Sequence, residues 1–228
     1  MVIYLLLLAV LLLLLLGPQI WVQRVFARYN LTTEPNFPGN GGELARHLLD
    51  RFSLSNVGVE ATAEGDHYDP QSKTVRMTRD KLKGRTLTAI TTAAHEVGHA
   101  LQDAADEPLF RTRTRLVAFA VVAQKLGSFL LFAAPLMTIV TRAPSAGLVS
   151  ALAAFLILGT NVIVQALTLP VELDASFKKA LPLLKSGYLT EQQQVGATRI
   201  LRAAALTYLA SSLAGLLNFW QWLRVLKR

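Results

Sequence analysis

The apolar run that begins at residue 2 constrains the fold more than any other feature of the sequence. Residues 2–22 read VIYLLLLAVLLLLLLGPQIWV and carry no charge. A helix needs about 20 mostly apolar residues to cross a hydrocarbon core of about 30 Å. The run lacks a basic segment before it and a cleavage site of small residues after it, so we expect a retained membrane anchor and not a signal peptide.

Three further stretches, residues 116–140, 147–169 and 203–223, have the length of a membrane span. The composition agrees, because 52% of the residues are hydrophobic and 17% are charged, which is more apolar than an average soluble domain. The last stretch is the least typical, since Asn218 and Gln221 lie near its end, and it either crosses the membrane or lies at its surface. We expect a mainly α-helical membrane protein with about four transmembrane helices.

The short connection between the second and third spans determines which polar segments share a side of the membrane. The sequence TRAPSA leaves room only for a turn, so these spans form a hairpin, and the polar segments 23–115 and 170–202 lie on the same side. Both segments carry many lysines and arginines, which favours the cytoplasm. The basic residues after the fourth stretch favour the opposite orientation unless that stretch does not cross.

Two features of the composition exclude classes of ligand and partner. The absence of cysteine excludes disulfides and thiolate metal ligands. The net charge of +8 suits the anionic headgroups of a lipid bilayer. The basic residues of the polar segments are mixed with acidic ones, so we infer no nucleic acid partner.

Residues 23–115 have the patterns of a small α+β region. Residues 42–52, GELARHLLDRF, carry apolar residues at helical spacing, and residues 86–104 also predict a helix. Residues 56–65 predict a short strand. Residues 67–78, HYDPQSKTVRMT, predict two short strands around a DPQSK turn.

The stretch TTAAHEVGHALQDA carries the pattern of a metal site. Residues i and i+4 of a helix lie on one face, so His95 and His99 can present imidazole nitrogens to one metal ion. Glu96 stands beside them, where it can take a proton from a metal-activated water, as in zinc metallopeptidases. Gly98 keeps the helix thin at this point. The alternative interpretation is a surface helix with two solvated histidines.

A catalytic zinc needs a third protein ligand, and the second polar segment offers Glu172 and Asp174 in TLPVELDAS. Pro170 fits the start of a new helix with Glu172 on its first turn. The hairpin puts this segment on the same side of the membrane as His95 and His99. Charged residues before and after the HEVGH helix place the site beside the bilayer and not inside it.

Two other groups of residues are candidates for contact with a substrate. Residues 74–78 predict an edge strand that pairs with an extended peptide substrate, or else a plain structural hairpin. His67 and Tyr68 are candidates for stabilising an oxyanion, although a turn residue and a core aromatic are the simpler interpretation. The strand residues are Thr74, Val75, Arg76, Met77 and Thr78.

Four segments, DHYDPQSKTVRMT, AAHEVGHALQDA, LPVELDAS and AAALTYLA, together resemble the YugP-like family of small bacterial membrane proteins, which are described as neutral zinc metallopeptidases. The resemblance covers nearly the whole chain from about residue 30 onward. More distantly, the arrangement is similar to that of HtpX and the CAAX-prenyl endopeptidases. Those proteins are membrane gluzincins with a hairpin of spans between HExxH and the third ligand.

The resemblance implies one Zn²⁺ per chain, held by the two motif histidines and Glu172, with Glu96 as the general base. In the distant relatives the third ligand begins an ExxxD pattern whose aspartate supports a ligand histidine. Ser176 stands at the position of that aspartate here. Asp174 and Ser176 therefore remain candidates for this support, and Asp174 remains an alternative third ligand.

We therefore expect a zinc metalloendopeptidase of the bacterial inner membrane that hydrolyses peptide bonds in membrane-associated or misfolded proteins. Its gluzincin-like α+β region is expected at the cytoplasmic surface of the bilayer. The alternative is a non-catalytic, metal-stabilised membrane scaffold or adaptor, and the intact Glu96 argues against it. The expected segments are an anchor at 1–22, a catalytic segment at 23–115, a hairpin of spans at 116–169, a third-ligand segment at 170–202 and a C-terminal transmembrane or interfacial helix at 203–228.

Overall fold

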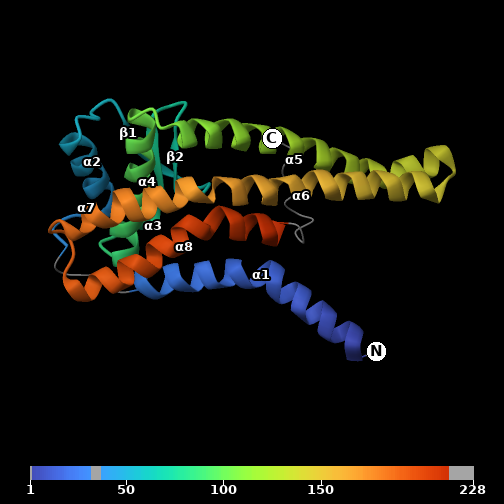
Figure 1. The fold of residues 1–228 in the computed structure, drawn as a ribbon, viewed down its shortest axis with the longest axis horizontal. Helices are drawn as coiled ribbons and strands as arrows, with labels where there is room; N and C mark the ends of the chain where they lie inside the picture. Colours follow the sequence, from blue (N-terminus) through green and yellow to red (C-terminus); the bar gives the residue numbers. More distant parts are fainter. Residues whose placement is uncertain (1, 32–36, 216–228) are drawn as a thin grey trace. The chain divides into compact units, whose positions relative to one another are not determined.

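The computed structural model describes residues 2–31 and 37–215 (Figure 1). These residues are mainly α-helical and divide into two compact units. Among the described residues, the first unit comprises 2–19, 112–169 and 208–215, and the second comprises 20–31, 37–111 and 170–207. Four helices contribute residues to both units: α1 (Val2–Asn30), α5 (Pro108–Thr141), α6 (Pro144–Asp174) and α8 (Glu191–Gly215).

Three helical segments within the described residues are long and apolar enough to cross a membrane. They are Ile3–Asn30, Pro108–Thr141 and Pro144–Lys185. The first three spans expected from the sequence lie within the helices α1, α5 and α6. The fourth, residues 203–223, extends past the end of the described part of the chain at Gly215, so it stays a prediction.

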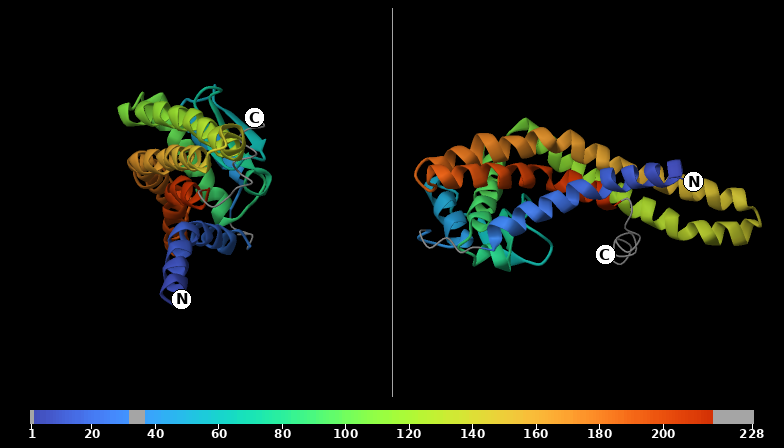
Figure 2. Two further views of the ribbon diagram at one scale, coloured as in Figure 1. Left: turned by 90° about the vertical axis from the view of Figure 1, so that its right-hand side faces the viewer. Right: turned by 90° about the horizontal axis from the view of Figure 1, so that it is seen from below.

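Helices α5 and α6 of the first unit run antiparallel and meet at the yellow turn in Figure 2. Helix α5 ends at Thr141 and α6 begins at Pro144. A hydrogen bond from Ser150 Oγ to Leu130 O, 3.1 Å long, joins the two helices. The short connection TRAPSA therefore forms the turn of a helical hairpin, as its length predicts.

The second unit combines short helices with a three-stranded sheet, and the helices and strands predicted between residues 42 and 104 are all present. The first of these helices begins with a capping box. Asn40 Oδ1 accepts from Glu43 N at 2.9 Å, and the Glu43 carboxylate accepts from Asn40 N at 2.8 Å. The elements are α2 (Gly41–Arg51), β1 (Gly58–Thr62), β2 (His67–Asp69), β3 (Thr74–Thr78), α3 (Arg79–Leu82), α4 (Leu87–Ala104), the π-helical η1 (Ala175–Ala180) and α7 (Leu181–Lys185).

Strand β3 lies in the middle of the sheet, whose order is β1-β3-β2. It pairs in parallel with β1 along its whole length and antiparallel with all of β2. The expectation that residues 74–78 form an edge strand for a substrate is therefore wrong. The physical reason lies in burial: Val75 and Met77 are fully buried, whereas β1 is exposed or half-buried throughout, as an edge strand can be.

The core of the second unit forms around α4. This helix contacts α2, β2, β3 and η1, so apolar residues on several of its faces are buried. Ala93 and Val97 of α4, Leu48 of α2 and the two β3 residues Val75 and Met77 are all fully buried in this core. This packing buries every residue of α4 from Leu87 to Ala100, including HEVGH.

The segment that carries Glu172 differs from the expectation. Pro170 lies inside α6, which continues to Asp174, and no new helix begins there. A proline in a helix removes one backbone hydrogen bond, but the buried side chains of Val171 and Glu172 keep this last turn of α6 packed in the second unit. The π-helical turn η1 follows directly, and such turns are frequent at functional sites.

Candidate metal centre

Helix α4 presents both motif histidines on one buried face. Thr86 caps its N-terminus, because Thr86 Oγ1 accepts from Ala89 N at 3.1 Å. His95 and His99 follow at the i, i+4 spacing, and their ring centroids lie 4.8 Å apart. Their exposed fractions are 2% and 1%, so the alternative of a surface helix with solvated histidines is wrong.

Glu172, from the last turn of α6, completes a cluster with these histidines. Its Oε2 lies 3.1 Å from His99 Nε2 and 3.5 Å from His95 Nε2. One ligand atom from each of the three residues lies within 4.8 Å of the other two. Two imidazoles and a carboxylate form a common ligand set of catalytic zinc, which keeps its fourth position for water. These residues could therefore hold a metal ion.

The other ring nitrogen of His95 is held by Ser176 in η1. Ser176 Oγ lies 3.0 Å from His95 Nδ1 and donates to Leu201 O at 3.1 Å. The hydroxyl has a single proton, which goes to Leu201, so Ser176 accepts the proton of His95 Nδ1. This tautomer places the lone pair of His95 on Nε2, the nitrogen that faces Glu172.

Gln102 holds the other ring nitrogen of His99 in the same way. Its Oε1 lies 2.9 Å from His99 Nδ1, and an amide oxygen can only accept. His99 therefore carries a proton on Nδ1, and its Nε2 is the nitrogen that faces Glu172. Sequence reasoning missed Gln102, although its position three residues after His99 places both side chains on one face of α4.

The donor set of the cluster fits a cation. In the neutral rings with the proton on Nδ1, each Nε2 has a lone pair for a metal ion, and the Glu172 carboxylate offers oxygen ligands beside them. His99 Nε2 and Glu172 Oε2 lie 3.1 Å apart, at hydrogen-bond distance. A divalent metal ion bound between the three groups would replace that contact, and imidazole with carboxylate suits zinc.

Glu96 lies next to the cluster in the sequence of α4 and is 4% exposed. Successive residues of a helix are rotated by about 100°, so Glu96 leaves the helix beside the face that carries His95. A buried carboxylate at this position suits a general base that acts on a water at the metal.

Gly98 allows α4 and η1 to approach each other closely. A Cβ atom at this position would lie 2.8 Å from Ala175 O and 3.3 Å from Lys179 Cβ. The first contact is closer than real Cβ atoms make, and it involves a backbone carbonyl that cannot turn aside. The glycine thus lets η1 bring Ser176 up to His95, in agreement with the prediction of a thin helix at this point.

Asp174 lies outside the cluster. Its Oδ2 accepts from Gln102 Nε2 at 2.9 Å, and Lys178 Nζ and Lys179 Nζ lie 3.3 Å and 3.8 Å from its carboxylate oxygens. Among the described residues, the group that could hold a metal contains Glu172 and not Asp174. Of the two residues expected to support the ligands, Ser176 contacts a histidine directly and Asp174 contacts one through Gln102.

Tyr68 and His67 form other contacts. The Tyr68 hydroxyl donates to Asp103 Oδ2 at 2.6 Å, and its ring packs near Phe110, whose ring in turn lies near His99. Burial, and then the bond to Asp103, raise the pKa of Tyr68 well above the ordinary value of a phenol. His67 Nδ1 lies 2.9 Å from a backbone carbonyl two residues earlier. These contacts and the burial of Tyr68 support its interpretation as a core aromatic, whereas His67 is the first residue of β2 and not a turn residue.

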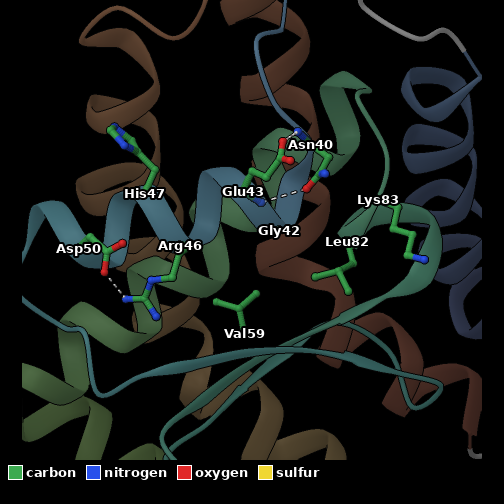
Figure 3. Close-up of a pocket in the computed structure, with 9 residues that line it drawn as sticks. All are labelled: Asn40, Gly42, Glu43, Arg46, His47, Asp50, Val59, Leu82 and Lys83. Carbon is green, nitrogen blue, oxygen red and sulfur yellow. Dashed lines mark hydrogen bonds and ion pairs between the residues drawn. The ribbon is translucent and has the colours of Figure 1, made fainter.

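A surface pocket of about 650 Å³ lies where α2 faces β1 and the end of α3 (Figure 3). Val59 and Leu82 contribute apolar surface to it. Arg46 pairs with Asp50 at 2.7 Å, and Glu43 is engaged in the cap of α2. No residue of the metal cluster lines this pocket. We therefore take the buried cluster, and not the pocket, as the candidate site.

Comparison with known proteins agrees with the geometry of the site. A family model described as "Putative neutral zinc metallopeptidase" matches residues 4–227. The chain is 30% identical over 216 residues to the "Putative membrane protease YugP" of Bacillus subtilis (strain 168), and the match covers 92% of each chain. No solved structure matches the chain.

Proposed function

We propose that this chain, which belongs to the neutral zinc metallopeptidase family, is a membrane-bound zinc peptidase. The observation that carries the proposal is the convergence of His95, His99 and Glu172 in the second unit, with the carboxylate of Glu96 next to the first ligand. The reaction is hydrolysis of a peptide bond by water. One Zn²⁺ per chain is proposed because the described part of the chain holds one such three-residue cluster.

Each residue of the site has one task in this proposal. A zinc ion held by the three ligands would acidify water and polarise the peptide carbonyl. Glu96 takes a proton from the attacking water and later delivers it to the leaving amine. The Nδ1–H groups of His95 and His99 donate hydrogen bonds to Ser176 Oγ and Gln102 Oε1. Both rings therefore keep Nε2 directed at the position of the metal ion throughout the reaction.

The proposed substrates are peptide segments of membrane-associated or misfolded proteins, and the proposed location is the cytoplasmic face of the bacterial inner membrane. Three helices that can cross a bilayer support membrane attachment. The lysines and arginines of residues 23–115 and 170–202 support the cytoplasmic side. The relative from B. subtilis is described as a membrane protease, which supports a protein or peptide substrate.

A paired measurement tests the enzymatic role of the site. Wild type and Glu96→Gln are purified in detergent, bound zinc is measured in each, and each is incubated with casein as an unfolded substrate. Glutamine has nearly the same shape as glutamate but cannot accept the proton. We expect about one zinc per chain in both proteins, as a three-ligand site requires, and cleavage by the wild type alone.

The other outcomes are also informative. Zinc in both proteins without cleavage by either would favour a metal-stabilised scaffold, and membrane-protein substrates would then be tested before the peptidase role is abandoned. Cleavage by both would remove Glu96 from the mechanism. Absence of zinc from the wild type, with the protein folded, would contradict the metal site itself.

A further inference from the structure

We propose that Gln102 is a positioning residue that sets the tautomer of His99 and clamps the chain on both sides of Glu172. The inference rests on the proposed metal site. Gln102 is 1% exposed and lies on α4, whereas Glu172 lies at the end of α6. A single side chain would thus prepare two of the three ligands.

The orientation of the Gln102 amide is dictated by its surroundings. Its Nε2 donates to Val171 O at 3.1 Å and to Asp174 Oδ2 at 2.9 Å. A backbone carbonyl and an ionised carboxylate can only accept. If the amide were flipped, its oxygen would face both of these acceptors inside the protein, at the cost of two buried hydrogen bonds.

The fixed amide determines the protonation of His99. With Nε2 committed to the two acceptors, Oε1 must point at His99 Nδ1, 2.9 Å away. An oxygen can only accept, so His99 satisfies the contact only when Nδ1 carries the proton. Nε2, which lies 3.1 Å from Glu172 Oε2, is then the nitrogen available to the proposed metal ion. The state of the ring is therefore set by residues that belong to the α6 segment.

The same amide also fixes the position of Glu172. Val171 precedes Glu172, and Asp174 follows it by two residues, so the two N–H groups hold the turn on both sides of the ligand. Asp174 is itself held by Lys178 and Lys179. Lys179 also pairs with Glu107 at 2.6 Å, which ties the clamp back to the chain just after α4.

A substitution of equal size distinguishes a positioning role of Gln102 from a role in packing alone. Methionine fills nearly the volume of glutamine but offers no donor and no strong acceptor. If Gln102 only fills space, Gln102→Met leaves the site unchanged. If it positions the ligands, the same change releases both His99 and the turn that carries Glu172.

The first readout is the tautomer of the histidine rings in metal-free protein, measured by ¹⁵N NMR. The chain contains only four histidines, and the variants His47→Gln and His67→Gln assign the two that lie outside the cluster. In the wild type we expect His99 to carry its proton on Nδ1. In Gln102→Met we expect this preference to be lost.

The second readout is the dissociation constant for zinc, measured by competition with a chelator. Loss of a residue that supports a ligand typically weakens zinc binding by about 10–100-fold, and we expect a change of this size in Gln102→Met. Leu101→Met is the matched control, because Leu101 is adjacent on α4 but rotated by about 100° from Gln102. It should bind zinc like the wild type.

Wild-type zinc affinity and an unchanged tautomer in Gln102→Met would overturn the inference. A wild-type His99 that carries its proton on Nε2 would overturn it without any variant, so the test does not depend on the folding of Gln102→Met. If the wild type binds no zinc, the proposed function fails, but the tautomer of the metal-free protein still decides the role of Gln102.

Discussion

Two carboxylates two residues apart, Glu172 and Asp174, compete for the role of third ligand, and their surroundings separate them. Glu172 is 2% exposed and lies against the Nε2 atoms of both histidines. Asp174 points to Lys178 and Lys179 and receives an N–H from Gln102. At the scale of single residues, one carboxylate belongs to the cluster that could hold a metal ion, and the other contacts Gln102, which supports that cluster.

Removal of each carboxylate should therefore have a different effect on zinc binding. Loss of a supporting residue costs about 10–100-fold in affinity, so Glu172→Ala, which removes a ligand itself, should weaken binding by more than about 100-fold. In Asp174→Ala, Gln102 still donates to Val171 O, so we expect zinc affinity to fall by no more than about 10-fold. Chelator competition on the two variants checks this, and equal losses, or a larger loss in Asp174→Ala, would reverse the assignment.

Ser176 and Gln102 give the two histidines neutral partners. The Ser176 hydroxyl can accept from His95 Nδ1 because its own proton goes to Leu201 O. Ser176 therefore orients the ring of His95 without placing a negative charge beside the candidate ligands.

At the scale of elements, the close approach of α4 and η1 determines the geometry of the site. Gly98 is the point of contact, since a Cβ there would meet Ala175 O at 2.8 Å. The π-helical turn carries Ser176, while the preceding turn of α6 carries Glu172. Any displacement of η1 would thus move the partner of His95 and strain the turn that holds the third ligand.

Gly98→Ala should destabilise the protein even though alanine favours helices. The gain in helix propensity is about 1 kcal/mol, and the cost of forcing a methyl group into a packed interior is about 1–3 kcal/mol. We expect a net loss of stability and weaker zinc binding, measured as the midpoint of thermal unfolding in detergent and by chelator competition.

Gly159→Ala in α6 is the matched control, because no heavy atom lies within 4 Å of the position of its Cβ. It should be neutral or slightly stabilising. A Gly98→Ala protein as stable as this control, with unchanged zinc affinity, would show that α4 and η1 can separate without cost to the site.

At the scale of the whole molecule, the candidate site requires that two distant parts of the chain share one side of the membrane. His95 and His99 come from residues 23–115, and Glu172 comes from residues 170–202. The hairpin of α5 and α6 connects these segments and crosses the bilayer twice in the proposed topology. An even number of crossings returns the chain to the side from which it left.

Cysteine labelling tests this topology without interference, because the chain has no cysteine of its own. We expect Gln71→Cys and Lys185→Cys to react with an impermeant maleimide only in inside-out vesicles. Ser145→Cys, next to the turn of the hairpin, should react only in right-side-out vesicles. If Gln71→Cys and Lys185→Cys react in vesicles of opposite orientation, the two polar segments do not lie on the same side of the membrane. If both react only in right-side-out vesicles, the segments share a side, but that side is not the cytoplasm.

The sequence by itself determined the features that depend on neighbours a few positions apart. The i, i+4 spacing of His95 and His99, the helix from Leu87 to Ala104 and the three apolar segments follow from local periodicity. The sequence also indicated Glu172 as the candidate third ligand, because the turn between two spans decides on which side of the membrane a later segment emerges.

Only the tertiary structure decided which side chains meet across the fold. Ser176 reaches a histidine 81 residues earlier, and Gln102 reaches Asp174, 72 residues later. The central place of β3 and the passage of α6 through Pro170 likewise depend on what packs against them. The physical reason is that periodicity records which face of an element is buried, while the partner on that face is chosen by contacts between segments that the sequence keeps far apart.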